Sequence, residues 1–329
     1  MRRRLLLSSG CALALPSLAL AQPAPAGRGP QTLGLLTDYL VPAADLQAAR
    51  DDLARLGWRD GVNLRFVHRA RDRQVEQVDA AVADLLASRP DVVIVAHDEL
   101  ARAVQLRDDR MPIVIMLGAD PVGNGLAASL QRPGGRVTGL VTMYADIRPK
   151  LFETARQLAP KARRIAGMFH LAGAATPQLE AVLDRGRQLA RQVDAEYLPV
   201  PVRDRGEIET LVTSLQPVSD HVLLVNLDAV LGPNFPRIAA AARAARLASG
   251  SQGLIYARQG GLMSYGIDID TYRERALALA DKVLRGTPPG DIPIEQPTLI
   301  RLVLNRATAR AIGLTIPLPL LLRADEVIE

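Results

Sequence analysis

The chain has 329 residues, a length that suggests about two domains and allows a large buried core. Hydrophobic residues make up 48% of it and charged residues 23%, as in a globular protein, and the 3% share of aromatic residues argues against a base-stacking nucleic-acid surface. The formal charge of +5 comes from arginines scattered among acidic residues, which favours solvated faces and local ion pairs over a dense anion-binding patch.

The N-terminus has the pattern of an export signal. Residues 1–21, "MRRRLLLSSGCALALPSLALA", begin with three arginines, continue with a short apolar stretch and end in Ala-Leu-Ala. Gly10 and Pro16 interrupt the apolar stretch and make it a poor permanent membrane span. We therefore predict a signal peptide cleaved after Ala21, a flexible Pro/Ala-rich tether at 22–30, and a periplasmic or otherwise extracytoplasmic mature protein. The arginines also resemble a twin-arginine signal, so the sequence leaves the export route open.

The mature chain lacks the residues of most metal and thiol sites. Cys11 is the only cysteine, and cleavage would remove it, which excludes disulfides and cysteine–metal sites. The four histidines are widely separated, and none has a nearby acidic residue in a zinc-helix pattern. We predict no metal and no cofactor.

Strand-like and helix-like segments alternate after the tether, which is typical of parallel sheets covered by helices on both faces. The first set has expected strands at 32–39, 64–70, 91–96 and 111–117, and expected helices at 42–58, 74–90 and 99–108. The second set has expected strands at 137–142, 164–170, 195–202, 221–227 and 253–257, and expected helices at 147–160, 176–193, 205–215 and 234–249. Two more strand–helix units follow, within 260–286 and 292–317.

Two sets of similar length predict an α/β protein with two doubly wound parallel-sheet lobes joined by a multi-strand hinge. We assign residues 31–140 plus about 261–290 to the first lobe. Residues 141–260 plus about 291–329 form the second.

A glycine-rich stretch at 119–139, "ADPVGNGLAASLQRPGGRVTG", follows the fourth strand. Its "GNGLAA" partly mimics a dinucleotide fingerprint, but a true fingerprint belongs to the first strand–turn–helix of its unit. Walker-type sequences and Gly-x-Ser-x-Gly elbows are missing from the chain. We interpret the glycines as turn residues that lead the chain into the strand at 137–142.

Five blocks in the same order resemble a known family. They are "RDDLARLGWRDGVNLRFVHRARD", "DPVGNGLAASLQRPGGRVTGL", "GGLMSYGID", "PIEQPT" with "LNRATARAIGLTIP", and the terminal "LLRADEVIE". Together they resemble the ABC transporter substrate-binding proteins of the type I periplasmic-binding fold, in the group related to tryptophan and aromatic amino-acid binders.

The resemblance implies a binding protein rather than an enzyme. Two lobes would close by hinge motion on a small polar or amino-acid-like ligand, and a membrane permease with its ATPase would take up that ligand. It implies a monomer that binds no nucleic acid. Two alternatives stay open: a ligand-sensing module for a membrane receptor, and a cleft enzyme on the same scaffold.

Ligand contacts on such a fold come from side chains just after the strands. The candidates are Thr37, Asp38, Tyr39, His97, Asp98, Asp120, Pro121, His170, Asn226, Asp228 and Tyr265. For Asp120 a turn-forming role competes with ligand contact, because Asp-Pro readily starts a turn.

Three departures from the family pattern fall at the expected cleft. His97-Asp98 stands where relatives carry a Gly-Thr-like pair, His170-Leu171-Ala172-Gly173 replaces an Asn-Pro-like turn, and "RLASGSQG" at 246–253 replaces a stretch with "RLP". These departures leave the identity of the ligand open.

Overall fold

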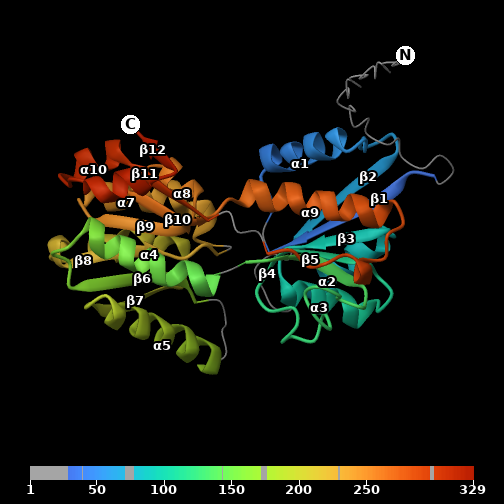
Figure 1. Ribbon diagram of the computed structural model, residues 1–329, viewed down its shortest axis with the longest axis horizontal. Helices are drawn as coiled ribbons and strands as arrows, with labels where there is room; N and C mark the ends of the chain where they lie inside the picture. The colour runs from blue at the N-terminus through green and yellow to red at the C-terminus, as the bar shows by residue number, and fades with distance from the viewer. Residues whose placement is uncertain are drawn as a thin grey trace, which may run out of the picture.

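The computed structural model describes residues 29–38, 40–70, 78–142, 144–171, 176–228, 230–296 and 300–329. They form two α/β lobes that lie side by side along the long axis of the molecule (Figure 1). The predicted signal peptide, tether residues 22–28 and Tyr39 lie outside the described residues. Among the residues described, no helix combines the length and the apolar character needed to cross a bilayer.

The first lobe is built on a five-stranded parallel sheet in the order β2-β1-β3-β4-β5. Its strands are β1 (Gln31–Thr37), β2 (Leu64–Ala70), β3 (Val92–Val95), β4 (Ile113–Gly118) and β5 (Val137–Val141). Its helices are α1 (Ala43–Arg55), α2 (Val78–Ala87), α3 (Asp98–Arg107) and α9 (Ile269–Leu284).

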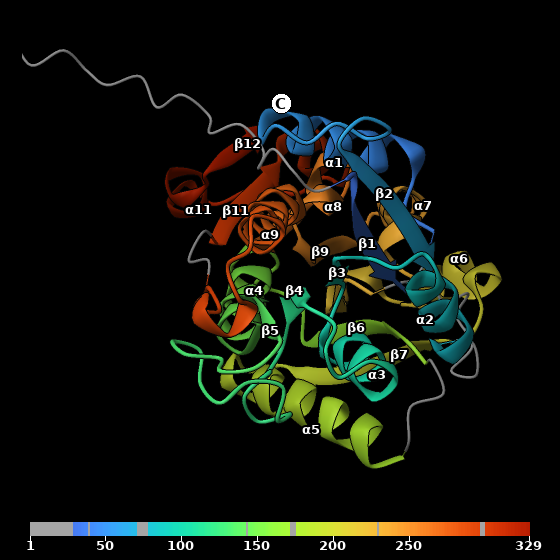
Figure 2. The ribbon, with the colours of Figure 1, turned by 90° about the vertical axis from the view of Figure 1, so that its right-hand side faces the viewer.

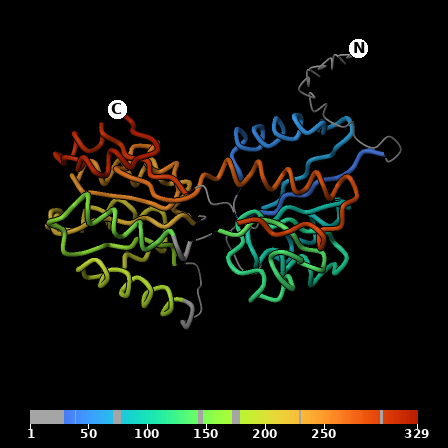
Figure 3. The backbone as a smooth tube through the Cα atoms, in the orientation of Figure 1, coloured from blue at the N-terminus to red at the C-terminus, as the bar shows by residue number. Residues whose placement is uncertain are grey.

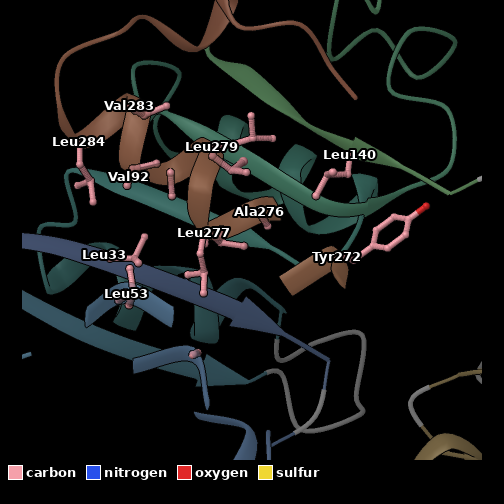
Figure 4. Close-up of a cluster of buried hydrophobic side chains, with 14 of the residues drawn as sticks. Leu33, Leu53, Val92, Leu140, Tyr272, Ala276, Leu277, Leu279, Val283 and Leu284 are labelled. Carbon is pink, nitrogen blue, oxygen red and sulfur yellow. The ribbon is translucent and has the colours of Figure 1, made fainter. Parts of the chain in front are cut away.

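Helices cover both faces of this sheet, which explains why its central strands are apolar throughout. Val92 and Ile94 of β3 pack into the core under α1 and α9, whereas Val93 and Val95 pack into the core under α2 and α3. Figure 2 shows the two helix pairs on opposite sides of the sheet. Figure 4 shows the first core, where Leu277 of α9 lies near Leu33 of β1.

The second lobe is built on a seven-stranded sheet in the order β12-β11-β10-β9-β8-β6-β7, in which only the β10–β11 pair among the described strands is antiparallel. Its strands are β6 (Arg164–His170), β7 (Glu196–Val202), β8 (His221–Val225), β9 (Ala248–Gly253), β10 (Met263–Ile267), β11 (Ile300–Asn305) and β12 (Glu326–Ile328). Its α-helices are α4 (Tyr144–Leu158), α5 (Thr176–Gln192), α6 (Ile208–Thr213), α7 (Phe235–Ala244), α8 (Ile255–Arg258), α10 (Arg306–Ile312) and α11 (Leu318–Arg323). Together the two sheets confirm the predicted fold class.

The central strand of the second sheet was not predicted. Residues 248–253, "ASGSQG", form β9, although we expected a helix to residue 249 and a strand at 253–257. The short helix α8 lies within that expected strand instead. Small residues suit β9 because its neighbours pack tightly: a Cβ on Gly250 would lie 2.6 Å from Cε of Met263. A strand without large apolar side chains gives no hydrophobic alternation to detect.

The chain passes between the lobes after Val141, after Ile267 and after Gln296 (Figure 3). Strand β10 pairs with β9 and β11, so residues 263–267 belong to the second sheet, although the sequence grouped them with the first lobe. Helix α9 follows directly and packs in the first lobe.

Candidate functional site

The carboxyl ends of the two sheets face each other. Strand β5 ends where the chain leaves the first lobe, and β10 ends where it leaves the second, so both strands point toward the other lobe (Figure 1). In open α/β sheets ligands bind at the carboxyl ends of the strands. Most of the candidate residues lie at these two edges.

Two side-chain pairs lie at the edge of the first lobe. Thr37 Oγ1 lies 2.8 Å from His68 Nε2, and burial, followed by the charge of Arg69, lowers the pKa of His68. Asp38 Oδ2 lies 2.6 Å from His97 Nε2, within hydrogen-bond distance, and both residues are half-buried. Both pairs join neighbouring strands, so they fix the shape of this edge.

Asp98, the first residue of α3, has a structural role toward the loop after β4. It is 7% exposed, and its Oδ2 accepts hydrogen bonds from Ala119 N, Asp120 N and Asn124 Nδ2. Its Oδ1 is buried against Gly118 and has no hydrogen-bond partner in the described part of the chain. A carboxylate enclosed in this way holds the loop in place and offers no free oxygen to a solute.

Asp120 has the turn-forming role that the sequence analysis weighed against ligand contact. Its Oδ1 accepts a hydrogen bond from Gly123 N at 2.8 Å, and a Cβ on Gly123 would lie 2.1 Å from Oδ2. Pro121 is buried, and its carbonyl accepts from Leu126 N and Ala127 N.

The glycine-rich loop has no free row of amides for a phosphate. The N–H groups at 119, 120 and 123–127 all donate within the protein. Phosphate-binding loops need such groups unoccupied. Gly134, at φ +74°, turns the chain before β5, in line with the interpretation of these glycines.

Asp228 holds the ends of β6 and β8 together in the second lobe. Its Oδ1 accepts from Val230 N and Leu231 N at 2.9 and 2.8 Å, and its Oδ2 accepts from His170 N at 3.1 Å. Three backbone donors thus share this carboxylate. The half-buried amide of Asn226 makes no hydrogen bond to another described residue, which leaves it available to a solute.

Tyr265 lies in β10 where the two lobes meet, and it packs against the cores of both. On the adjacent strand, Gln252 is 7% exposed near the carboxyl end of β9. Gln252 is not among the predicted site residues, because β9 itself was not predicted. A glutamine in the segment that departs from the family pattern was the available signal.

Arg148 was also missed. It lies in the first half of α4, and burial lowers the pKa of its guanidinium, with Tyr197 opposing this effect and Arg185 adding to it. It forms no ion pair with any described residue. An arginine stays protonated at neutral pH despite such a shift, so Arg148 carries a positive charge near Tyr197 of β7.

Two cavities lie elsewhere. One of about 650 Å³ is lined by residues of α5, and one of about 250 Å³ lies at the amino ends of the first sheet, beside Gln31 and Asp91. Within the described ranges, no group of three or more His, Cys, Asp or Glu side chains is placed to hold a metal ion.

The family model for ABC transporter substrate binding proteins matches residues 43–328. The chain is also similar to the tyrosine-binding protein of Clostridioides difficile (strain R20291), with 24% identity over 260 residues that cover 78% of this chain and 73% of the relative.

Two solved structures share the fold. One is a conserved domain protein from Vibrio cholerae O1 biovar El Tor, with a TM-score of 0.76, 20% identity, and coverage of 90% of this chain and 99% of the other. The second is an ABC domain from Streptococcus pneumoniae in complex with L-Trp, with a TM-score of 0.74, 22% identity, and coverage of 91% and 100%. The fold is that of type I periplasmic binding proteins. Because the family model matches most of the chain and the fold agrees with it, this protein belongs to the ABC transporter substrate-binding protein family.

Proposed function

We propose that the protein captures a small polar or amino-acid-like solute between the facing carboxyl edges of its two sheets and closes on it by hinge motion. The main supporting observation is the facing of two polar strand edges, joined by three chain crossings. A binder of this kind needs contacts from both lobes, because only the closed form gains both sets.

The relatives support an amino-acid-like solute. One is named a tyrosine-binding protein, and another was solved with L-Trp. Within the proposed site, Asn226 and Gln252 supply amide groups, and the Asp38–His97 pair supplies a carboxylate and an imidazole.

Delivery to a membrane permease and its ATPase, in an extracytoplasmic compartment, completes the proposal. The binder acts as a monomer and carries out no chemical step itself. The family membership supports this role over catalysis. Cell fractionation should find the mature chain, cleaved after Ala21, outside the cytoplasm.

The experiment is native mass spectrometry of gently purified protein, followed by a thermal-shift screen of amino acids and other small polar solutes. A ligand that binds the native state stabilises it by mass action, by about 2.7 kcal/mol at a hundredfold excess over Kd. This added stability raises the melting temperature. If no solute co-purifies and none raises the melting temperature, the proposal fails. Turnover of a bound compound would favour the enzyme alternative instead.

A further inference from the structure

Gln252 has the properties of a ligand contact. It lies near the carboxyl end of β9, the middle strand of the seven-stranded sheet, and is 7% exposed. Its side-chain amide makes no hydrogen bond to any described residue. Burying an amide without a partner is unfavourable, so a ligand that pairs with it gains affinity.

The amide of Gln252 also differs from the other buried polar groups. Gln31 Oε1 and Asp98 Oδ1 are enclosed and have no hydrogen-bond partner among the described residues, so no solute reaches them. Neither amide atom of Gln252 is enclosed in that way. The group is therefore mostly buried, unpaired and still accessible.

The strand register indicates the direction of this side chain. Side chains alternate along a strand, so Gln252 shares a face with Ala248 and Gly250. Ala248 packs in the core under α4, and Gly250 faces Met263 of β10. Tyr265 of β10 lies on this same face, because it packs against the core that contains Ala248 and Met263.

The backbone holds Gln252 firmly. A Cβ on Gly266 would lie 1.8 Å from the carbonyl oxygen of Gln252, and the β9–β10 register shifts at this point. Such irregularities re-aim side chains and occur beside binding sites. Only a glycine at 266 permits this approach.

Helix α4 supplies a matching electrostatic environment. It begins at Tyr144, shortly after β5 ends, so its N-terminus lies at the carboxyl edge, on the face that carries Gln252. A helix N-terminus has free N–H groups and a positive end of the helix dipole.

We propose that Gln252 determines solute class by donating a hydrogen bond from Nε2 to a carboxylate seated at the start of α4. This inference rests on the proposed function, since it assumes that a solute binds between the lobes. It assigns the solute to carboxylate-bearing compounds.

The test compares L-amino acids with their carboxamides by thermal shift and isothermal titration calorimetry. Wild-type protein should prefer the free acid. Gln252→Glu has the same shape but puts a negative charge beside the carboxylate, so affinity for the acid should fall more than about tenfold. The matched control is Gln259→Glu, the same change at an exposed glutamine in this lobe, which should leave affinity unchanged.

Each outcome has a distinct meaning. Equal affinity of Gln252→Glu and wild type for the free acid overturns the proposal. Tight binding of a solute without a carboxylate also overturns it, while the proposed binding function stands. Binding of no solute by wild type removes both. If Gln252→Glu melts well below wild type without ligand, Gln252→Met carries the test, because it keeps the volume and removes the donor.

Discussion

At the scale of single residues, the acidic side chains at the two edges serve mainly to hold backbone in place. The sequence predicts Asp98, Asp120 and Asp228 at strand ends, where ligand contacts form. The hydrogen-bond donors to their carboxylates could not be predicted, because these depend on the path of the following loop. In the fold, each of these carboxylates accepts from backbone N–H groups.

Replacing Asp228 with asparagine should lower stability. The amide can still accept from Val230 N and Leu231 N, but an NH₂ group then faces His170 N, which is left without an acceptor. We expect the free energy of unfolding to fall by about 1–2 kcal/mol, measured by urea denaturation at pH 7.

Asp184→Asn is the control for this change. Asp184 is exposed on α5 and pairs with Arg187 at the surface, so its replacement should change stability by less than about 1 kcal/mol. If Asp228→Asn leaves stability unchanged but greatly lowers solute affinity, the structural role of Asp228 is refuted. The carboxylate would then be a ligand contact.

At the scale of elements, the strands and helices that could be predicted are those with a clear hydrophobic pattern. The apolar strands β3 and β4 and the amphipathic helices α1 and α9 were predicted from it. Strand β9 was not, because its neighbours leave room only for small residues. Gln252 was therefore missing from the predicted site residues, since it lies on that strand.

In helix α5, the packing around Gly186 opposes the usual gain in helix stability from replacing a glycine with alanine. Replacing a helical glycine with alanine usually stabilises a helix, by about 1 kcal/mol. At Gly186, however, a Cβ would lie 2.5 Å from Cζ of Tyr197. The ring also lies close over the backbone of Gly167 in β6, where an added Cβ would be 2.2 Å from the tyrosine hydroxyl, so it has little room to move away. We expect Gly186→Ala to lower the free energy of unfolding by about 1–2 kcal/mol.

A double-mutant cycle checks the cause. In a Tyr197→Ala background the ring is gone, and Gly186→Ala should then be neutral or stabilising. The measurement is thermal unfolding followed by circular dichroism for all four proteins. The same loss in both backgrounds would show that something other than the tyrosine ring penalises the new methyl group.

At the scale of the whole molecule, the connections between the lobes are tied down on the side of the first lobe. Glu295 donates its N–H to Gly139 O and accepts from Val141 N, and its carboxylate accepts both Nε and Nη2 hydrogen bonds from Arg275 of α9. Tyr272 donates its hydroxyl to Val141 O at 3.3 Å, and burial raises the pKa of this tyrosine to about 12. These hydrogen bonds hold two of the connections, at Val141 and at Glu295, to the first lobe.

The proposed closure is measurable as a distance between the lobes. The processed chain is predicted to have no cysteine, so Ala44→Cys on α1 and Ala181→Cys on α5 give two exposed spin-label sites, one in each lobe. Pulsed electron resonance should show a shorter distance when the solute identified by thermal shift is added, because contacts from both lobes form only in the closed state. Arg275→Gln removes the salt bridge to Glu295 and should broaden the distance distribution of the unliganded protein. The control is Lys150→Gln, which breaks an exposed salt bridge within α4 and should leave the distribution unchanged. A distance that stays the same with saturating solute would mean that binding occurs without closure.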